Sequence, residues 1–307
     1  MKRFSTLALA FALLLCALAC GTPNTESDRP KVVCTIFPQY DFIRRIAGDR
    51  VELTMLCAPG GEVHGYDPSL KEMSGILKAD LFVYVGGETD RWVADLLRTN
   101  GSDLNAVALT ALCDTLDEER VEGMQGEAED EPEPDEHVWT SPKNAIRIVE
   151  GLTDALCGIL PDEADAMRAN AAAYIAELNA LDDEFHELMR DAKRTTIVFA
   201  ERFPFRYLCD ELGLAYYAAL PGCSSNEEVA LSTVSFLIDR VKTENLPYVF
   251  TIEFSDGRIA RTIADATGCG VLSLHSCHNV SREEFDTGVG YLDLMRQNLE
   301  NLRKAVN

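Results

Sequence analysis

Basic residues are scarce in this chain of 307 residues, which has 28 lysines and arginines against 51 aspartates and glutamates. The formal net charge of −23 at pH 7 repels phosphate backbones, so the composition argues against nucleic-acid binding. It also repels an anionic lipid surface, so attachment to a membrane would need a lipid anchor. Charge therefore argues against two common classes of partner.

Several catalytic and metal-binding motifs are also absent. The sequence has no Walker loop, no Gly-x-Gly-x-x-Gly and no Ser-His-Asp order. The ten cysteines form no Cys-x-x-Cys pair, which argues against a thiolate zinc knuckle. Cysteines in an exported protein can form disulfides, whose pairing cannot be read from the sequence. For Cys34 and Cys157, which lie inside apolar runs, we expect burial as small apolar residues instead.

The N-terminus has the features of a bacterial lipoprotein signal. Lys2 and Arg3 precede an apolar core over residues 7–18, which is too short to span a bilayer as a helix. The core ends at small residues followed by Cys20. We predict that residues 1–19 are a signal peptide and that Cys20 is the site of lipid attachment; the alternative is an ordinary secretory signal. Residues 20–30 are polar and proline-rich, which suits a flexible tether.

Short apolar runs alternate with helical patterns in two separate series. This alternation predicts an α/β fold with two lobes, each a mostly parallel sheet flanked by helices. The first lobe spans residues 31–161 and the second spans residues 193–307. The strands that we expect are residues 32–37, 51–56, 81–85, 107–109, 196–200, 215–220, 248–252 and 271–274.

One long helix is predicted to join the two lobes. Residues 162–192 contain no glycine or proline, and apolar residues recur among them in steps of three or four. The pattern predicts a linking helix over residues 162–192. A helix of this length can act as a rigid spine between the lobes.

An acidic segment interrupts the first lobe at residues 114–136. Acidic residues dominate it, with glycine, proline and glutamine among them, so the sequence predicts a mobile loop that contributes nothing to a packed core. The loop would either collect cations weakly near a binding site or simply be solvated.

Histidine is rare as well, with five in the chain, and three of them stand beside turn-forming sequence. His64 follows a Pro-Gly-Gly turn, His137 precedes a Thr-Ser-Pro turn, and His275 ends an apolar run. A neutral imidazole at the end of a strand is the commonest protein ligand for zinc. A single loop histidine is usually only solvated, so the three are informative together. His186 lies inside the predicted linking helix, and we interpret it as a surface residue without a role.

Two motifs resemble ligand loops of the zinc and manganese solute-binding lipoproteins, the metal receptors of bacterial ABC importers. Pro-Gly-Gly-Glu-Val-His64-Gly-Tyr-Asp-Pro-Ser is similar to that family's first ligand loop. His137-Val-Trp-Thr-Ser-Pro-Lys-Asn-Ala is similar to its second, which follows an acidic or His-rich loop. The linking helix resembles the family's spine, and the segment that begins at Tyr291 resembles its last helix. The resemblance covers essentially the whole mature chain.

The resemblance implies a metal site between the lobes, with His64 and His137 supplied by the first lobe. Counting back from Tyr291 places His275 at the family's last ligand position. His278 would then support a ligand without binding the metal itself.

The resemblance leaves the remaining ligand open. Arg202, which cannot ligate a metal, occupies the position where the family carries its third ligand. Glu201 is its neighbour in sequence, and Glu253 ends the predicted strand over residues 248–252. Glu201, Glu253 or a water molecule would complete the coordination sphere.

Together these features predict an extracytoplasmic receptor, anchored to the bacterial cell membrane as a lipoprotein. Three imidazoles and one carboxylate favour Zn²⁺ as the transported ligand, with Mn²⁺ possible if more oxygens bind. The expected partners of this monomer are an ABC permease and its ATPase, and we expect no enzymatic activity. The alternative function is a secreted zinc-dependent hydrolase, with Glu201 or Glu253 as general base.

Overall fold

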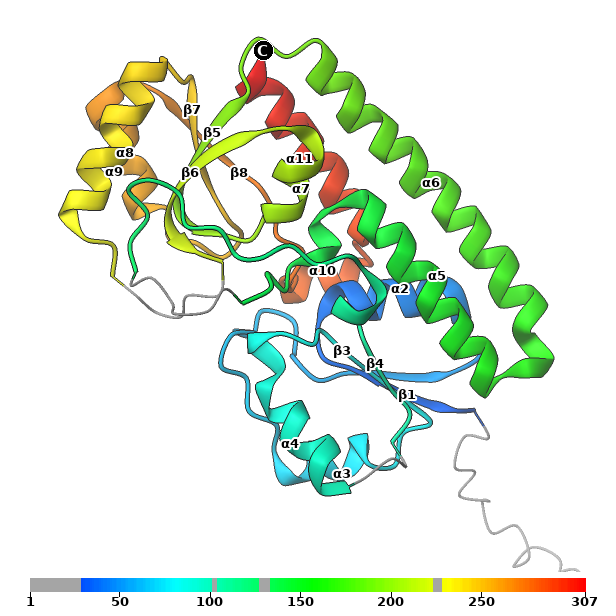
Figure 1. Ribbon diagram of the computed structural model, residues 1–307. Helices are drawn as coiled ribbons and strands as arrows, with labels where there is room; N and C mark the ends of the chain where they lie inside the picture. The colour runs from blue at the N-terminus through cyan, green and yellow to red at the C-terminus, as the bar shows by residue number, and fades with distance from the viewer. Residues whose placement is uncertain (1–28, 101–103, 127–132, 223–227) are drawn as a thin grey trace, which may run out of the picture.

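The computed structural model describes residues 29–100, 104–126, 133–222 and 228–307 (Figure 1). The predicted signal peptide, Cys20 and most of the predicted tether lie outside the described residues. Within them the chain forms two sheets of four parallel strands each, flanked by helices. This arrangement confirms the predicted α/β fold class. No helix in these ranges is both long and apolar enough to cross a membrane.

The first sheet has the strand order β2-β1-β3-β4, with every neighbouring pair parallel. Its central strands β1 and β3 are almost fully buried, as their continuous apolar sequences require. Cys34, at the end of β1, is buried and unpaired, and so is Cys157 in α5. The elements of this lobe are β1 (Lys31–Cys34), α2 (Phe37–Ala47), β2 (Glu52–Met55), α3 (Leu70–Ile76), β3 (Leu81–Tyr84), η1 (Glu88–Asp90), α4 (Arg91–Asn100), β4 (Ala106–Ala108), η3 (Thr110–Leu112), η4 (Val138–Thr140) and α5 (Pro142–Ile159).

The second sheet repeats the same topology with the strand order β6-β5-β7-β8. The connections between its strands are long enough to form helices that pack on the sheet. α8 and α9 cover the sheet at the end of the molecule away from the first lobe (Figure 1). The elements are β5 (Thr196–Phe203), α7 (Arg206–Leu212), β6 (Ala215–Pro221), α8 (Leu231–Glu244), β7 (Tyr248–Thr251), α9 (Arg258–Thr267), β8 (Gly270–Ser273), α10 (Arg282–Thr287) and α11 (Tyr291–Val306).

A single 27-residue helix, α6 (Ala164–Arg190), follows the short η5 (Pro161–Glu163) and runs along one side of both lobes (Figure 1). At 1.5 Å per residue it is about 40 Å long. It packs on α2 and α5 of the first lobe and on α7 and α11 of the second. Its buried positions recur every three or four residues, as the sequence pattern predicts: Met167, Ala171, Tyr174, Leu178, Leu181, Phe185 and Leu188.

The acidic segment is less free than its composition suggests. Gln125 donates its backbone N–H to the carbonyl of Ala219 on the edge strand β6, over 2.9 Å. Its side-chain oxygen accepts from Ala230 N at 2.6 Å, just before α8. The described residues of this segment therefore contact the second lobe, so the expectation that it contributes no packing is wrong for them. The sequence did not show these contacts because Gln125 pairs with backbone groups of distant residues.

The lobes are also tied by a buried tryptophan. Trp139 in η4 is fully buried and donates its indole N–H to the carbonyl of Ser276, in the segment after β8, over 2.8 Å. Its own carbonyl accepts a hydrogen bond of 2.6 Å from the Tyr291 hydroxyl at the start of α11. Because these groups are buried, each bond also satisfies a polar atom that water cannot reach.

One helix was not anticipated from the sequence. α10 is only six residues long, with a capping box in which Ser281 and Glu284 satisfy each other's backbone N–H groups. A helix this short shows too little periodicity for the hydrophobic pattern to reveal it.

We predict that Trp139→Phe lowers the free energy of unfolding by about 2–4 kcal/mol, since it leaves a buried carbonyl unpaired and removes volume from the core. Urea unfolding of the metal-free protein measures this loss. Trp92→Phe is the control, because the Trp92 indole nitrogen has no hydrogen-bond partner among the described residues. Equal losses in the two variants would contradict the role of the Trp139–Ser276 bond.

Candidate metal site

Three histidines from the two lobes converge where the sheets face each other. His64 lies in the loop after β2, His137 directly before η4, and His278 in the segment between β8 and α10. Possible ligand atoms of these three residues and of Glu136 lie within 4.8 Å of one another. The ring centroid of His278 is 4.8 Å from that of His64 and 4.7 Å from that of His137. We call these four residues the cleft cluster.

The Nε2 atoms of the three histidines are buried and have no hydrogen-bond partner among the described residues. Buried polar side-chain atoms nearly always have a partner, so three orphans in one place need a physical explanation. A cation that accepts a lone pair from each nitrogen would satisfy all three at once. The donor set, with imidazoles and a carboxylate, fits Zn²⁺.

Asp135 holds the ring of His137 in the orientation that this chemistry needs. Its Oδ1 lies 2.9 Å from Nδ1 of His137, and it also accepts the His137 backbone N–H at 2.8 Å. With the Nδ1 proton donated to the carboxylate, Nε2 presents its lone pair to the cluster. Burial lowers the pKa of His137, but the negative charge and hydrogen bond of Asp135 outweigh it, and the net pKa is raised.

The pKa of His278 is shifted in the opposite direction. Burial, followed by the positive charges that His137, His64 and Arg202 can carry, lowers its pKa well below 6.5. The imidazole is therefore neutral at physiological pH and keeps a lone pair available for a metal. Its Nδ1 lies 3.2 Å from the hydroxyl of Ser276, which fixes the ring from behind.

His64 has two polar neighbours at Nδ1. Oε1 of Glu62 lies 3.2 Å away and Nη1 of Arg202 lies 2.9 Å away. The hydrogen bond with His64 lowers the pKa of Glu62 to about 2, so this carboxylate is ionised and can accept the Nδ1 proton. In that tautomer Nε2 is free to bind a metal. Arginine can only donate, so the Arg202 guanidinium, which is nearer to Nδ1 than Glu62 is, would have to move aside in that tautomer. Its positive charge also lies beside any ion in the cluster.

Glu136 is the carboxylate of the cleft cluster. It is buried, and one oxygen accepts the backbone N–H of Thr89 at 2.9 Å while the other accepts the Thr89 hydroxyl. A carboxylate has about four lone-pair directions, so these two bonds leave room for a metal. It lies directly before His137, inside the acidic segment, where nothing in the sequence distinguishes it from its acidic neighbours.

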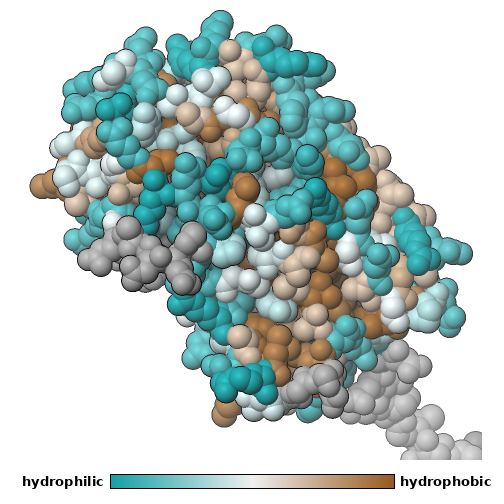
Figure 2. All heavy atoms as spheres, viewed as in Figure 1, coloured by the Kyte–Doolittle hydropathy of each residue, from teal (hydrophilic) through white to brown (hydrophobic). Residues whose placement is uncertain are grey.

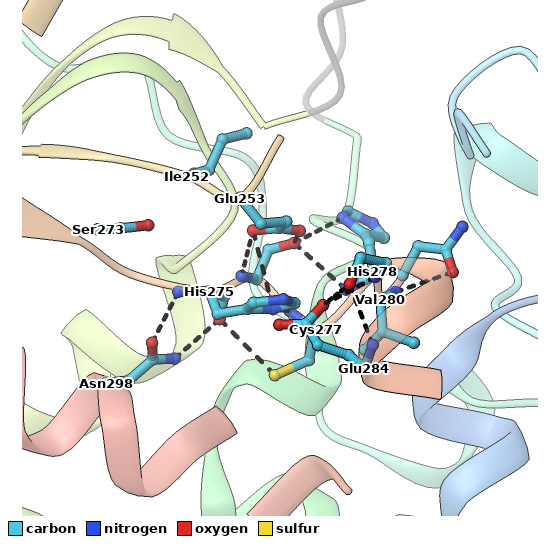
Figure 3. A network of polar contacts seen from close by, with 12 residues as sticks. Ile252, Glu253, Ser273, His275, Cys277, His278, Val280, Glu284 and Asn298 are labelled. Carbon is cyan, nitrogen blue, oxygen red and sulfur yellow. Dashed lines mark hydrogen bonds and ion pairs between the residues drawn. The ribbon is translucent and has the colours of Figure 1, made fainter. Parts of the chain in front are cut away.

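His275 is close by but is turned into a different set of contacts (Figure 3). Its Nδ1 accepts the backbone N–H of Cys277 at 2.9 Å, and its own backbone pairs with Asn298 through bonds of 2.7 and 2.8 Å. Cys277 has a φ of 63°, a left-handed conformation that is rare outside glycine. This turn directs His278 toward His64 and His137 and leaves His275 outside the cleft cluster.

The two glutamates predicted as alternative ligands are bound to serines. Glu253 accepts the backbone N–H of Ser276 at 2.7 Å and the hydroxyl of the same residue. Glu201 accepts the hydroxyl of Ser255, and burial raises its pKa. The structure brings neither of them into the cleft cluster, although both line the adjoining cavity.

A cavity of about 340 Å³ opens beside the cleft cluster. His64 of the first lobe and His278 of the second are both part of its wall, together with Arg202 and Glu253. The outer surface is hydrophilic over much of the second lobe (Figure 2). Because His64 and His278 line the cavity, an ion that enters it meets two of the three histidines.

Comparison with known proteins places the chain among metal receptors. Residues 32–305 match the family model described as zinc-uptake complex component A, periplasmic (ZnuA). The zinc-binding lipoprotein AdcA of Streptococcus pneumoniae is 31% identical over all of this chain, which spans 62% of AdcA's length. The high-affinity zinc uptake system protein ZnuA of Bacillus subtilis is 29% identical over 99% of this chain and 98% of its own.

A solved structure shares the fold. The Zn(II)-bound ZnuA-like domain of Streptococcus pneumoniae AdcA superimposes with a TM-score of 0.77 and 30% identity, over 91% of this chain and 99% of that domain. Fold and site thus define a two-lobed α/β protein with a histidine cluster between its lobes. The chain belongs to the ZnuA family of periplasmic zinc-uptake components.

The raised pKa of His137 leads to a prediction about pH. Protons and metal compete for this imidazole. Because its pKa lies above 6.5, metal affinity should already begin to fall at a pH above 6.5 when the solution is acidified. Asp135→Asn removes the charge that raises the pKa, so the midpoint of this fall should move to lower pH. At pH 8, where protons no longer compete, the variant should bind Zn²⁺ about 10–100-fold more weakly, because the ring loses its orientation.

Zn²⁺ titrations against a competing chelator between pH 5.5 and 8 test both statements. Asp114→Asn is the matched control, since Asp114 is an exposed residue of the same acidic segment that pairs with Arg147. An Asp135→Asn midpoint at higher pH, or an unchanged affinity at pH 8, would show that Asp135 does not support His137.

Proposed function

We propose that this protein captures Zn²⁺ between its two lobes and delivers it to an ABC permease powered by an ATPase. The ligands in this proposal are His64, His137 and His278, with Glu136 as the fourth. The observation that carries it is the convergence of three buried Nε2 atoms without hydrogen-bond partners beside a buried carboxylate.

The choice of metal follows from the donor set. Three imidazoles and one carboxylate suit a four-coordinate Zn²⁺, with bonds of about 2.0–2.2 Å. Mn²⁺ prefers more oxygen ligands, and this cluster offers only one carboxylate. The two relatives described above are named for zinc binding and zinc uptake, which supports the same choice. Because the chain spans under two thirds of AdcA, that likeness supports only the shared part.

The ligand set predicted from the sequence is the alternative. In that set, His275 and either Glu201 or Glu253 join His64 and His137. The Nε2 of His275 is also buried and has no hydrogen-bond partner among the described residues, but to bind a metal through it His275 would have to give up the bond that its Nδ1 accepts from Cys277. The cleft cluster already brings one possible ligand atom of each member within 4.8 Å of the others, and we therefore favour it.

The hydrolase considered from the sequence finds no support. Its candidate general bases, Glu201 and Glu253, each accept a serine hydroxyl in the structure. The description of the family to which the chain belongs refers to zinc uptake and to no chemical reaction.

Two substitutions separate the alternative ligand sets. We predict that His278→Ala weakens Zn²⁺ binding by at least about 100-fold, more than the loss of a supporting residue usually costs. His275→Ala, three residues away, should keep most of the affinity. Calorimetric titration and melting curves with and without Zn²⁺ measure this, since bound metal at a hundred times its dissociation constant adds about 2.7 kcal/mol of stability.

The reverse result would contradict the proposed ligand set. If His275→Ala abolishes the metal-induced rise in melting temperature while His278→Ala retains it, the sequence-derived set is correct. Melting of both variants without metal provides the folding control.

We further propose that the receptor is an extracytoplasmic monomer anchored to the membrane through a lipid on Cys20. The charged start, short apolar core and small-residue site before Cys20 support this proposal. Growth of producing cells with an alkyne fatty acid should label the wild type and not Cys20→Ser. A Cys20→Ser protein that still incorporates the label and stays in the membrane fraction would disprove the anchor.

A further inference from the structure

We propose that a second divalent transition-metal ion binds at Asp182, His186 and Glu211, on the joint between the spine helix α6 and the second lobe. We call these three residues the spine cluster. They lie outside the cavity and the cleft cluster, and the proposal does not depend on the function proposed above.

The geometry of the spine cluster brings three possible ligands together. Asp182 and His186 are one turn apart on α6, so their side chains share a face of the helix. Glu211 reaches them from α7. One donor atom from each lies within 4.8 Å of the others. Two ligands of a tetrahedral zinc ion are roughly 3.4 Å apart, so a small movement of the side chains closes the site.

Two oxygens of the spine cluster have no partner outside the cluster among the described residues. Oδ1 of Asp182 and Oε1 of Glu211 are buried, and within the described ranges the partner recorded between these two groups is the hydrogen bond of one carboxyl group with the other. The other oxygen of Glu211 accepts the hydroxyl of Ser141. No lysine or arginine forms an ion pair with Asp182 or Glu211 in the described part of the chain. The basic group recorded there is His186, whose Nδ1 lies 3.0 Å from the Asp182 carbonyl and 3.5 Å from Oδ1 of Asp182, so its Nε2 is the nitrogen left for a metal.

Without a metal, one of the two carboxyl groups holds a proton at or below neutral pH, and a cation would take the place of that proton. Burial first, and then the neighbouring Asp182 carboxylate, raises the pKa of Glu211 to about 7. Two carboxylates this close are stabilised by a cation between them. A divalent ion would neutralise both and use both buried oxygens at once.

The chemistry of the spine cluster also indicates the class of ion. One imidazole with two carboxylates suits Zn²⁺ and similar borderline cations, with water in the remaining positions. The His186 side chain is 49% exposed, so an ion and its waters can enter from solvent. With three protein ligands instead of four, the spine cluster should bind Zn²⁺ more weakly than the cleft cluster.

A bound ion would reinforce the joint between the lobes. It would tie α6 to α7 and, through the Glu211–Ser141 bond, to the first turn of α5. Ser141 caps α5 by accepting the backbone N–H of Asn144 at 3.1 Å, and that helix begins just after His137. The second ion would therefore stabilise the scaffold that carries one wall of the cleft cluster.

The stoichiometry of Zn²⁺ in the untagged mature protein tests the proposal. Equilibrium dialysis with elemental analysis should find two equivalents in the wild type, the second weaker. His186→Ala should weaken this second equivalent at least tenfold and leave the first unchanged. Glu187→Ala is the matched control, because Glu187 is the next residue on α6 and pairs with Arg190 instead. It should retain both equivalents.

A companion variant keeps the two proposals distinguishable. His278→Ala should lose the tight equivalent while still binding one ion at the spine cluster, where the NMR signals of the His186 ring should shift. Saturation of the wild type at one equivalent overturns the spine site, and so does a second equivalent that persists in His186→Ala. Neither result bears on the cleft cluster, which stands or falls with the tight equivalent.

Discussion

The bond between Asp135 and the buried ring of His137 is the interaction on which the candidate site depends. A buried imidazole can turn either nitrogen outward, and only a fixed Nδ1 proton leaves Nε2 for a metal. Asp135 fixes it at 2.9 Å, and its own carbonyl is held at 2.6 Å by the hydroxyl of Tyr207 in the second lobe. The orientation of a first-lobe histidine is thus set partly by the opposite lobe.

Because of this bond, the orientation of His137 depends on the position of the second lobe relative to the first. The parallel strands of each sheet end toward the other lobe, so the loops that follow them meet at one place. α6 packs on helices of both lobes, and Trp139 bonds across to Ser276, two residues before His278. The ligand geometry is therefore largely preformed, which lowers the entropic cost of binding an ion.

The sequence predicted the fold well because its signals are local. Buried parallel strands appear as short apolar runs, and α6 appears as an unbroken pattern of apolar residues at helical spacing. His64 and His137 could be singled out for a related reason, since each is flanked by turn-forming residues.

The rest of the site could not be read from the sequence. His275 and His278 are three residues apart in an irregular segment, and the left-handed backbone at Cys277 decides which of them faces the cleft. No periodic pattern encodes such a turn. Cysteine does not favour the left-handed backbone conformation, so its presence at position 277 does not predict the turn. Glu136 was hidden among acidic neighbours, and its role depends on Thr89, which is distant in sequence.

We propose that His278, with His64, His137 and Glu136, surrounds the metal. Crystals of the zinc-loaded protein, measured on both sides of the zinc absorption edge, test it most directly. We expect an anomalous peak in the cleft, about 2.0–2.2 Å from the three Nε2 atoms and from one Glu136 oxygen. A cleft peak bound by His275 together with Glu201 or Glu253, and not by His278, would contradict it.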